Sequence, residues 1–444
     1  MTDITRRNFT RAAALTTALS YSRISGANDR VRMGYIGLGN RGDQVHEAFL
    51  EHGDQQTVAV CDLRDDYMDF AIKKSRATPT KYIEYQALLE DKDVDAVVIA
   101  TPDHWHALMF IDACNAGKDV YVEKPLSLTV VEGRKMVEAA ERTRRVSQVG
   151  TQRRSTASLK EAAEIVRSGG IGHVTVAKSY HIGNDWPHGI DNPPDGEPPS
   201  PKEWDQWLGP APKVPYNKNR TYYKFRWFYN YSGGQLTNFG VHNVDMMRWC
   251  LGAEYPHRAV ALGGKYVMQD NREIPDTFEV IWEYDGTLMT FSQYDANAAK
   301  TNPPGAEIEL RGTKGTMYLQ GGHWEVVPEQ LTDLDFFART PLDRVSERAY
   351  RTGRKTLVEP RSGGKAAEST QAHARNFLDC VRSRNNCTAD VQIGHVSTAT
   401  TLLGNIAHKT GSLLEWDGHT ERFTNNEAAN RLLSYKYRAP YKLG

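Results

Sequence analysis

The chain of 444 residues has no net charge, no long apolar run and few cysteines. Its 55 Lys and Arg residues are balanced by 55 Asp and Glu residues and form no basic stripe, so a nucleic-acid partner is not expected. No segment is long and apolar enough to span a bilayer, which predicts a mature chain without a membrane span. The five cysteines are irregularly spaced and fit neither a disulfide framework nor a zinc pattern, so no metal site is expected.

The length suits two domains with extensions, because single cores stop growing beyond about 250–300 residues. A charged fraction of 25% and a hydrophobic fraction of 39% are typical of a globular protein. We expect a leader at 1–28, a first domain at 29–150, a second domain at 151–424 with an aromatic-rich insertion at 185–231, and a C-terminal arm at 425–444.

The first 28 residues resemble a twin-arginine export signal. Arg6 and Arg7 are followed by Phe9 and by a short run of small and apolar residues over 12–20. The small residues around Ala27 suit a cleavage site. This pattern predicts export to the periplasm, and the alternative is a disordered basic N-terminus.

A glycine-rich turn follows the first apolar run of the presumed mature chain. The segment 31–36 leads directly into Gly37-Leu38-Gly39-Asn40-Arg41-Gly42, after which a helical pattern begins. The three glycines permit a tight turn, close approach of a pyrophosphate, and close packing of helix on strand. The N–H groups that open the helix, Asn40 and Arg41 among them, can then bind the phosphates. The motif predicts a dinucleotide site.

Further apolar runs support a doubly wound parallel sheet over 29–150. The run 57–61 ends in Asp62, which can bind ribose hydroxyls and favours NAD, although Arg41 and Arg64 keep NADP open. Strands at 94–100 and 119–122 also end in polar clusters, and ligands of such sheets bind at these carboxyl ends. The residues expected at the cofactor are Gly37, Gly39, Asn40, Arg41, Gly42, Asp62, Thr101, Pro102, His104, His106, Glu123, Lys124 and Gln152.

These motifs together resemble the glucose-fructose oxidoreductase / inositol dehydrogenase / MocA family. The resemblance is carried by the glycine motif, by Thr101-Pro102 with His106, by Glu123-Lys124-Pro125, and by a Gly-rich segment that ends in His242 and Asp245. It implies an α/β protein, with a Rossmann domain followed by an α/β domain whose open sheet is mostly antiparallel. That sheet often serves as an oligomer interface, so a homo-oligomer is expected.

The resemblance also assigns catalytic roles. Lys124 matches the family's catalytic lysine, which stabilises a developing alkoxide and relays its proton. Asn238 stands where an Asp is usual, four residues before His242, and an amide cannot exchange a proton at neutral pH. His242 therefore becomes the leading general acid/base. Asp245 is expected to orient it or to cap the helix.

The second domain should supply the substrate contacts. Gln152 and Arg153 follow the last strand of the first domain and should enter the cleft. The insertion is expected to be a loop that closes over the cleft or wraps a neighbouring subunit. The C-terminal arm is expected to dock on its own or a neighbouring subunit. The expected substrate contacts are Arg153, His181, Asp185, Arg226 and His242.

The leading functional prediction is an NAD(P)-dependent oxidoreductase that transfers a hydride between nicotinamide and a sugar, inositol or related polyol. Export favours a tightly bound cofactor, because free dinucleotide is scarce outside the cytoplasm. The alternative is a redox-neutral glycoside hydrolase or lyase that acts through a transient keto-sugar, although the Tyr-bearing helix segment of such relatives is not found around His242. A third reading is a non-catalytic sugar-binding protein.

Overall fold

A computed structural model describes residues 30–301, 303–332, 354–364 and 369–444. The predicted export signal lies outside the described residues. In the part of the chain that is described, no helix combines the length and the apolarity that a bilayer crossing requires.

The first sheet has six parallel strands in the order β3-β2-β1-β4-β5-β6, as expected for a doubly wound domain. Residues of β4 and β5 are buried throughout, which explains their continuous apolar sequence. The strand order changes direction between β1 and β4, because β2 and β3 lie on one side of β1 while β4, β5 and β6 lie on the other, so the carboxyl ends of β1 and β4 form the crevice. The strands are β1 (Val31–Ile36), β2 (Gln55–Cys61), β3 (Thr80–Tyr82), β4 (Ala96–Ile99), β5 (Asp119–Val122) and β6 (Ser147–Val149).

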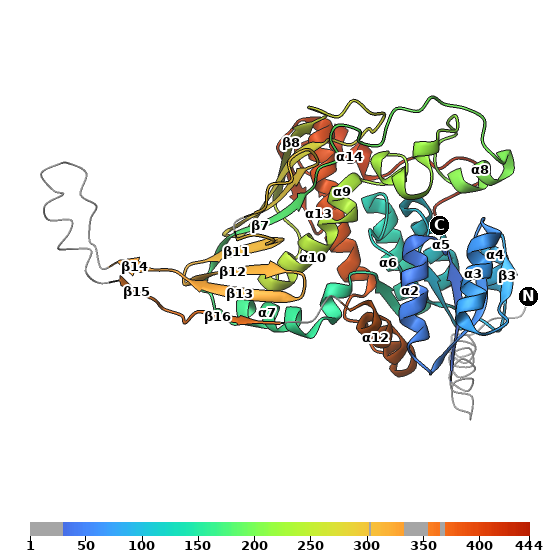
Figure 1. Cartoon of the computed structure of the whole chain (residues 1–444), viewed down its shortest axis with the longest axis horizontal. Coiled ribbons are helices and arrows are strands. Elements are labelled where there is room, and N and C mark those ends of the chain that lie inside the picture. The colour runs from blue at the N-terminus through green and yellow to red at the C-terminus, as the bar shows by residue number, and fades with distance from the viewer. Residues whose placement is uncertain (1–29, 302, 333–353, 365–368) are drawn as a thin grey trace, which may run out of the picture.

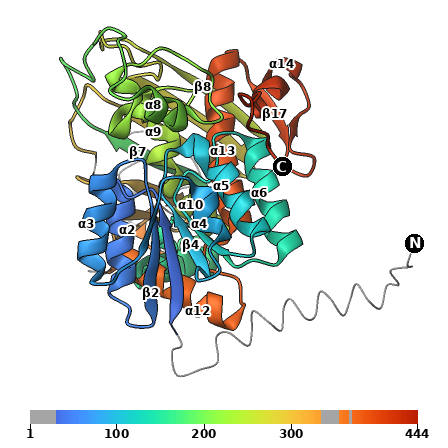
Figure 2. The same ribbon diagram turned by 90° about the vertical axis from the view of Figure 1, so that its right-hand side faces the viewer.

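Helices cover both faces of this sheet (Figure 2). One apolar core joins the sheet to α2, α3 and α12, and a second joins it to α4, α5 and α6. Because α12 comes from the far end of the sequence, the C-terminal part of the chain completes the first domain. The helices are α2 (Asn40–Leu50), α3 (Asp65–Ser75), α4 (Tyr85–Glu90), α5 (Asp103–Asn115), α6 (Val130–Thr143) and α12 (Thr370–Ser383).

The second sheet has ten strands in the order β16-β13-β12-β11-β7-β10-β9-β8-β17-β18. Only the β7–β10 pair is parallel among its described pairs, which confirms the expected open, mostly antiparallel sheet. Alternate residues of β9 point inward, as in a sheet covered on one face. The strands are β7 (Val174–Ile182), β8 (Arg258–Gly264), β9 (Thr277–Tyr284), β10 (Thr287–Tyr294), β11 (Ile308–Gly312), β12 (Gly315–Gln320), β13 (His323–Pro328), β16 (Arg361–Gly363), β17 (Leu414–Asp417) and β18 (Arg422–Phe423).

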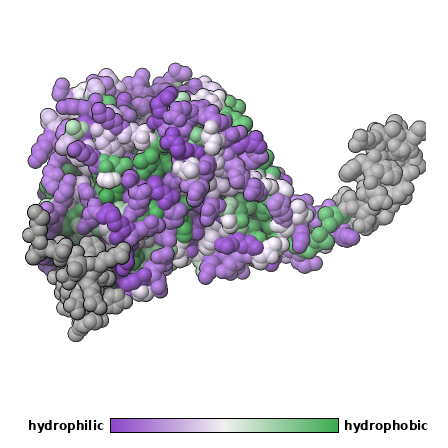
Figure 3. Space-filling model, turned by 180° about the vertical axis from the view of Figure 1, so that it is seen from behind, coloured by the Kyte–Doolittle hydropathy of each residue, from purple (hydrophilic) through white to green (hydrophobic). Residues whose placement is uncertain are grey.

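Three helices cover the inner face of the second sheet: α7 (Ala157–Arg167), α10 (Gly240–Leu251) and α13 (Val391–Thr410). The pair β14 (Leu331–Thr332) and β15 (Arg354–Lys355) projects away from the body (Figure 1). Residues 333–353, between these two strands, lie outside the described part. The face turned away in Figure 1 is mostly hydrophilic, with apolar residues in separate patches (Figure 3).

The insertion at 185–231 is not the plain loop that was expected. It contains α8 (Pro201–Leu208), η2 (Lys218–Arg220) and η3 (Tyr222–Trp227). Ser200 caps α8 by accepting a hydrogen bond from the Glu203 N–H at 3.3 Å, and Pro201 occupies the first turn. The insertion has its own apolar cluster, made of Ile190, Trp204, Leu208, Ala211, Trp227, Phe228 and Tyr231 with Ile274.

The C-terminal arm docks on its own chain. The Tyr437 hydroxyl donates to Glu132 Oε1 on α6 at 2.5 Å. Arg438 donates to the Gly209 carbonyl at 2.9 Å, just beyond α8. Tyr441 packs edge-on against Trp105 of α5. The arm therefore joins the first domain to the insertion.

Candidate functional site

The glycine loop between β1 and α2 leaves room for a phosphate. A Cβ at Gly37, where φ is +85°, would meet the backbone of Ala100 at 2.8 Å, and one at Gly42 would meet the Gly37 carbonyl oxygen at 2.0 Å. A Cβ at Gly39 would approach only Tyr67, at 3.8 Å. No side chain caps α2, so its first N–H groups are available to a bound anion. This cradle fits a dinucleotide pyrophosphate.

Asp62 closes the same loop from the end of β2. Its carboxylate accepts the Leu38 N–H at 2.7 Å and the Arg64 N–H at 2.9 Å. Burial raises the pKa of Asp62, and these backbone donors oppose that rise. A carboxylate has about four acceptor sites, so two remain for ribose hydroxyls.

Lys124 extends from the end of β5 next to this crevice, and the Lys124–Pro125 bond is cis. Its ammonium donates to the Asn238 carbonyl oxygen at 2.9 Å and to Asn238 Oδ1 at 3.0 Å. Burial lowers the pKa of Lys124 to about 8, although the nearby Glu123 and Asp103 carboxylates oppose this. A lysine with this pKa can exchange a proton near neutral pH.

The neighbouring Glu123 belongs to the framework rather than to the open cleft. Its side chain is 4% exposed, and its Oε1 accepts from Arg41 Nε at 2.9 Å. This ion pair links the end of β5 to the first turn of α2. Both residues were expected at the cofactor, and the structure pairs them with each other.

Asn238 ends α9 (Gly234–Asn238), and His242 lies in the first turn of α10. The His242 side chain is 8% exposed, and its Nδ1 has no hydrogen-bond partner among the described residues. Burial, followed by the nearby Lys124 and Arg153 cations, holds the pKa of His242 well below its ordinary value. The neutral form of the ring is therefore favoured more strongly than in the unperturbed histidine that the sequence suggested.

His106 links the two loops that flank Lys124. Its Nδ1 bonds to the Pro125 carbonyl at 2.8 Å and its Nε2 to the Thr101 carbonyl at 2.9 Å. His106 is 1% exposed and so positions the loops instead of touching a ligand. Thr101 and Pro102 are partly exposed in one of these loops.

Two expected site residues have other roles. His104 has no exposed surface, and its Nε2 bonds to the Trp207 carbonyl at 3.0 Å, so it anchors the insertion and does not face the cofactor. Asp245 accepts from Arg154 Nε at 2.8 Å and from Ser397 Oγ at 2.6 Å, with no exposed side-chain surface. It therefore anchors α10 and does not orient His242.

Arg153 also forms its contacts within the chain. It donates to Asn243 Oδ1 at 2.6 Å and pairs with Glu307, and its side chain is 5% exposed. This pairing joins η1 (Gln152–Ser155) to α10 and the second sheet. The structure thus gives Arg153 a structural partner where the sequence predicted a substrate contact. Gln152, in the same turn, is partly exposed.

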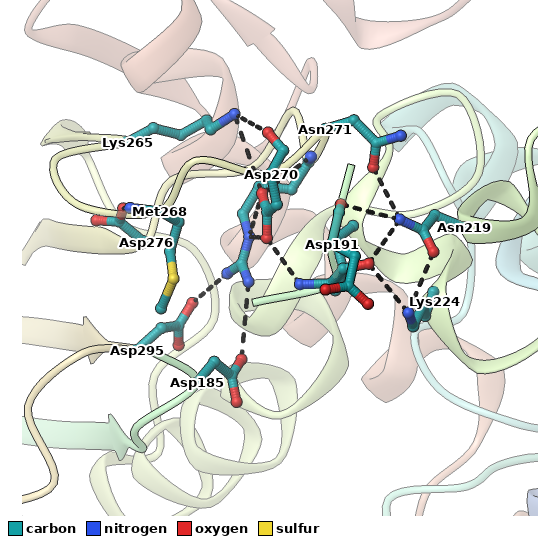
Figure 4. Close-up of polar contacts among 12 residues, drawn as sticks. Asp185, Asp191, Asn219, Lys224, Lys265, Met268, Asp270, Asn271, Asp276 and Asp295 are labelled. Atoms are coloured by element: carbon teal, nitrogen blue, oxygen red, sulfur yellow. Dashed lines mark hydrogen bonds and ion pairs between the residues drawn. The ribbon is translucent and has the colours of Figure 1, made fainter. Parts of the chain in front are cut away.

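Asp185 belongs to a buried ionic cluster at the edge of the insertion (Figure 4). Arg272, whose side chain is fully buried, lies 2.8 Å from Asp270, 3.1 Å from Asp295 and 3.8 Å from Asp185. Burial raises the pKa of Asp295 to about 7. The Asp185 side chain is 49% exposed, so it reaches solvent while facing Arg272.

The segment η3 carries Arg226 and lies beside α9. Tyr222, at its start, faces Arg64 of the first domain at 5.6 Å from the ring centroid. Arg226 lies 3.7 Å over the Tyr223 ring. His181, at the end of β7, packs against Phe239 with ring centroids 5.0 Å apart. The insertion thus spans from the glycine-loop side of the first domain to the helix that contacts Lys124.

Two residues near the site were not expected from the sequence. Asp103, in the first turn of α5, accepts from Ser232 Oγ at 2.6 Å, and Tyr222 contacts Arg64. The position of Asp103 directly after Thr101-Pro102 was a usable signal, because acids favour the first turn of a helix. No signal pointed to Tyr222. No metal-binding group of His, Cys, Asp or Glu occurs among the described residues, and all five cysteines are unbridged.

The glycine cradle, the doubly wound sheet and the lysine at the end of β5 define a dinucleotide-binding oxidoreductase. Family models agree: residues 31–151 match an oxidoreductase NAD-binding Rossmann fold, residues 155–262 and 348–443 match an oxidoreductase C-terminal alpha/beta domain, and residues 211–318 match a GFO/IDH/MocA C-terminal domain. The chain belongs to the Gfo/Idh/MocA oxidoreductase family.

Curated relatives match over a limited part of the chain. A glycosyl hydrolase family 109 protein of Shewanella putrefaciens is 40% identical over 125 residues, covering 26% of this chain and 27% of the relative. An alpha-N-acetylgalactosaminidase of Shewanella oneidensis is 39% identical over 123 residues, with the same coverage. The matched region thus spans about a quarter of each relative's length.

Solved structures share the fold over most of the chain. A levoglucosan dehydrogenase in complex with NADH and levoglucosan has a TM-score of 0.63 at 16% identity, covering 87% of this chain and 99% of that one. The WlbA dehydrogenase of Bordetella pertussis, in complex with NADH and UDP-GlcNAcA, has a TM-score of 0.61 at 18% identity, with the same coverage. At these identities the likeness establishes the fold.

Proposed function

We propose that this protein is an NAD(P)-dependent oxidoreductase that transfers a hydride between nicotinamide and a sugar, inositol or related polyol. The observation that carries the proposal is Lys124, whose pKa is lowered to about 8 by burial, at the end of β5 beside the glycine cradle. The sugar ligands of the two dehydrogenases of similar fold support this substrate class.

In this reaction the residues of the protein would bind the cofactor, orient the catalytic lysine and accept the proton of the substrate hydroxyl. The glycine loop and the start of α2 hold the pyrophosphate, and Asp62 accepts hydrogen bonds from a ribose. Bound nicotinamide supplies the hydride acceptor or donor. During oxidation, neutral Lys124 takes the hydroxyl proton, and Asn238 holds the lysine in place through two hydrogen bonds. His242, whose pKa is lowered by burial and by the nearby Lys124, would serve as a second hydrogen-bonding group.

NAD is the cofactor we favour over NADP. Asp62 is partly exposed at the end of β2, and its carboxylate would repel a ribose phosphate. Arg64 is the nearby group that could accept such a phosphate, yet it pairs with Asp66 and lies 4.5 Å from the Tyr67 ring centroid. We further propose that the cofactor stays tightly bound, because the C-terminal arm holds the insertion next to the cleft.

A second candidate is redox-neutral glycoside hydrolysis through a transient keto-sugar. The names of the curated relatives, glycosyl hydrolase family 109 protein and alpha-N-acetylgalactosaminidase, favour it. The same lysine would serve this reaction, with a further base needed to take the proton next to the keto group. Asn238 cannot supply that base, because an amide does not exchange protons at neutral pH.

Two proposals concern where and how the protein works. Arg6, Arg7 and Phe9 support export by the twin-arginine route and a periplasmic location. Leu262, with 74% of its surface exposed on β8 of the open sheet, supports a homo-oligomer that covers that sheet. Fractionation of the native host and light scattering test these two proposals.

The function is tested by native mass spectrometry for retained dinucleotide, followed by a polyol and glycoside panel. Growth of reduced-cofactor absorbance with a polyol supports dehydrogenation. Release of a leaving group without net reduction supports hydrolysis. A purified, cofactor-stripped protein that binds neither NAD nor NADP by calorimetry would refute both readings.

A further inference from the structure

Arg226 is a cation without a counterion. Its guanidinium lies over the Tyr223 ring at 3.7 Å, and its buried Nε has no hydrogen-bond partner in the described part of the chain. No described carboxylate forms an ion pair with it. Taking a guanidinium partly out of water without a partner costs free energy, so such a group is normally paired. The pattern indicates that its partner arrives from outside the chain.

The other arginines around the cleft are already neutralised. Arg41 pairs with Glu123 at 2.9 Å, and Arg153 pairs with Glu307. Arg272 is surrounded by the acids of the cluster in Figure 4. Arg41 and Arg272 also have a buried nitrogen without a hydrogen-bond partner, but each is paired with a protein carboxylate, which Arg226 lacks in the described part of the chain.

Arg226 lies close to the catalytic lysine. The segment η3 packs against α9, which carries the Asn238 that holds Lys124. Burial is the largest influence on the pKa of Lys124 and lowers it, whereas two nearby acids raise it. Arg226 is the next influence and lowers this pKa further. It also contributes, after burial and against Asp185, to the lowered pKa of His181. The guanidinium therefore acts on the space where a substrate would meet Lys124.

Nearby acids do not supply the missing charge. Asp103 is 6% exposed and is bound by Ser232 at 2.6 Å, and burial raises its pKa. Asp185 faces Arg272 instead. Asn238, which contacts Lys124, is a neutral amide. Arg226 thus interacts with Asp103 only at longer range, and no described carboxylate lies within ion-pair distance of its guanidinium.

We propose that the substrate carries a carboxylate, as in a sugar acid of the uronate class, and that Arg226 binds it. A guanidinium offers two parallel N–H donors that match a carboxylate, which selects the acid over the neutral sugar of the same shape. The proposal rests on the proposed function for the reacting hydroxyl, but the carboxylate subsite is a binding property that can be measured separately.

The test is calorimetry on the holoprotein with two matched pairs of sugars, D-glucuronate against D-glucose and D-galacturonate against D-galactose. At least one uronate should bind roughly 10- to 100-fold more tightly than its neutral partner, as expected for a charge-assisted hydrogen bond. Arg226→Gln should remove this preference, and Arg226→Lys should restore part of it. The control is Arg220→Gln in the same insertion, since Arg220 lies over Phe228 at 4.6 Å and pairs with Glu273.

The outcomes separate the subsite from the function. If the uronates bind no better than the neutral sugars, or if Arg226→Gln weakens NAD binding instead of uronate binding, the subsite is wrong. If glucose reduces the bound cofactor and neither uronate does, the function stands and the subsite fails. If a uronate binds through Arg226 but no sugar changes the cofactor spectrum or is cleaved, the subsite stands and the function fails.

Discussion

Lys124 Nζ lies 3.0 Å from Oδ1 of Asn238, and the lysine ammonium donates to this neutral amide. A carboxylate at that distance would favour the charged lysine, whereas the amide leaves burial as the dominant influence. The amide therefore allows the lysine to titrate near pH 8. This relationship leads directly to the first prediction.

Asn238→Asp should raise the pKa of Lys124 by roughly 1–3 units, because an opposite charge within hydrogen-bond distance stabilises the ammonium. Alcohol oxidation needs the neutral amine, so its rate should rise with pH through a pKa near 8 in the native protein and at higher pH in the variant. A pH profile of kcat/KM measures this. Asn115→Asp, an exposed change on α5, should leave the profile in place, and coincident profiles for all three proteins would contradict the assignment.

Lys124→Ala should lower turnover by roughly 10²–10⁴-fold, the usual contribution of a general acid or base. Cofactor binding should survive, since the glycine loop is untouched. Steady-state kinetics and calorimetry with NAD check the two parts. Lys135→Ala, which removes an exposed lysine paired with Glu138 on α6, is the control. Unchanged turnover in the Lys124 variant would exclude the lysine from the mechanism.

His106→Phe should weaken folding and turnover together. The ring volume is nearly kept, but the Thr101 and Pro125 carbonyls lose their donors, at roughly 1–3 kcal/mol for each buried group left unsatisfied. Urea unfolding measures the free energy, and kinetics on the folded variant measures the loss of loop positioning. His52→Phe removes a single bond to the Gln371 carbonyl at the surface and should have a small effect. Equal effects of both substitutions would refute the loop-positioning role.

Glu132→Gln should change how stability depends on pH. Burial raises the pKa of Glu132 to about 7, above its ordinary 4.5, while the Tyr437 hydroxyl opposes the rise. The folded state then binds a proton that the unfolded state has lost, so this group's contribution to stability falls as pH rises from about 4.5 to 7. Relative to the native protein, the free energy of unfolding of the variant should therefore increase across that window, by about 1–3 kcal/mol at pH 8.

Urea unfolding at several pH values, with the native protein and the variant compared at each, isolates this contribution from other titrating groups. Glu138→Gln, an exposed change on the same helix, serves as the control. A difference between variant and native protein that stays constant from pH 4 to pH 8 would show that Glu132 has the same pKa in the folded and unfolded states, and would contradict the prediction.

The first domain was largely predictable because its signals are local. Continuous apolar runs mark buried parallel strands, and the expected strand at 119–122 matches β5 to the residue. The glycine loop was readable for the same reason, since Gly37 needs a positive φ that other residues resist. The helix α8 was not predicted, because the aromatic composition of the insertion suggested a loop. The sequence does contain a helix-start signal there, in Ser200, Pro201 and Glu203.

Pairings between distant residues were not predictable. Asp245 pairs with Arg154 across 91 positions of sequence, and Arg153 pairs with Glu307 across 154. The sequence therefore predicted a site role for Asp245 and for Arg153, and only the folded structure shows that each is paired with a distant residue. The pKa of His242 was not predictable either. The sequence suggested an ordinary histidine pKa, but burial and nearby cations from distant segments, Lys124 and Arg153, lower it.

The sequence by itself determined the class of fold and the glycine cradle, because strand burial and turn geometry act over a few neighbouring residues. Lys124 was identified by resemblance to the family, and its catalytic role stays a prediction. The tertiary structure alone decided which charges are neutralised and which remain for a ligand. The strength of an interaction between two charges depends on their distance in space. For residues far apart in the sequence, that distance is set only when the chain folds.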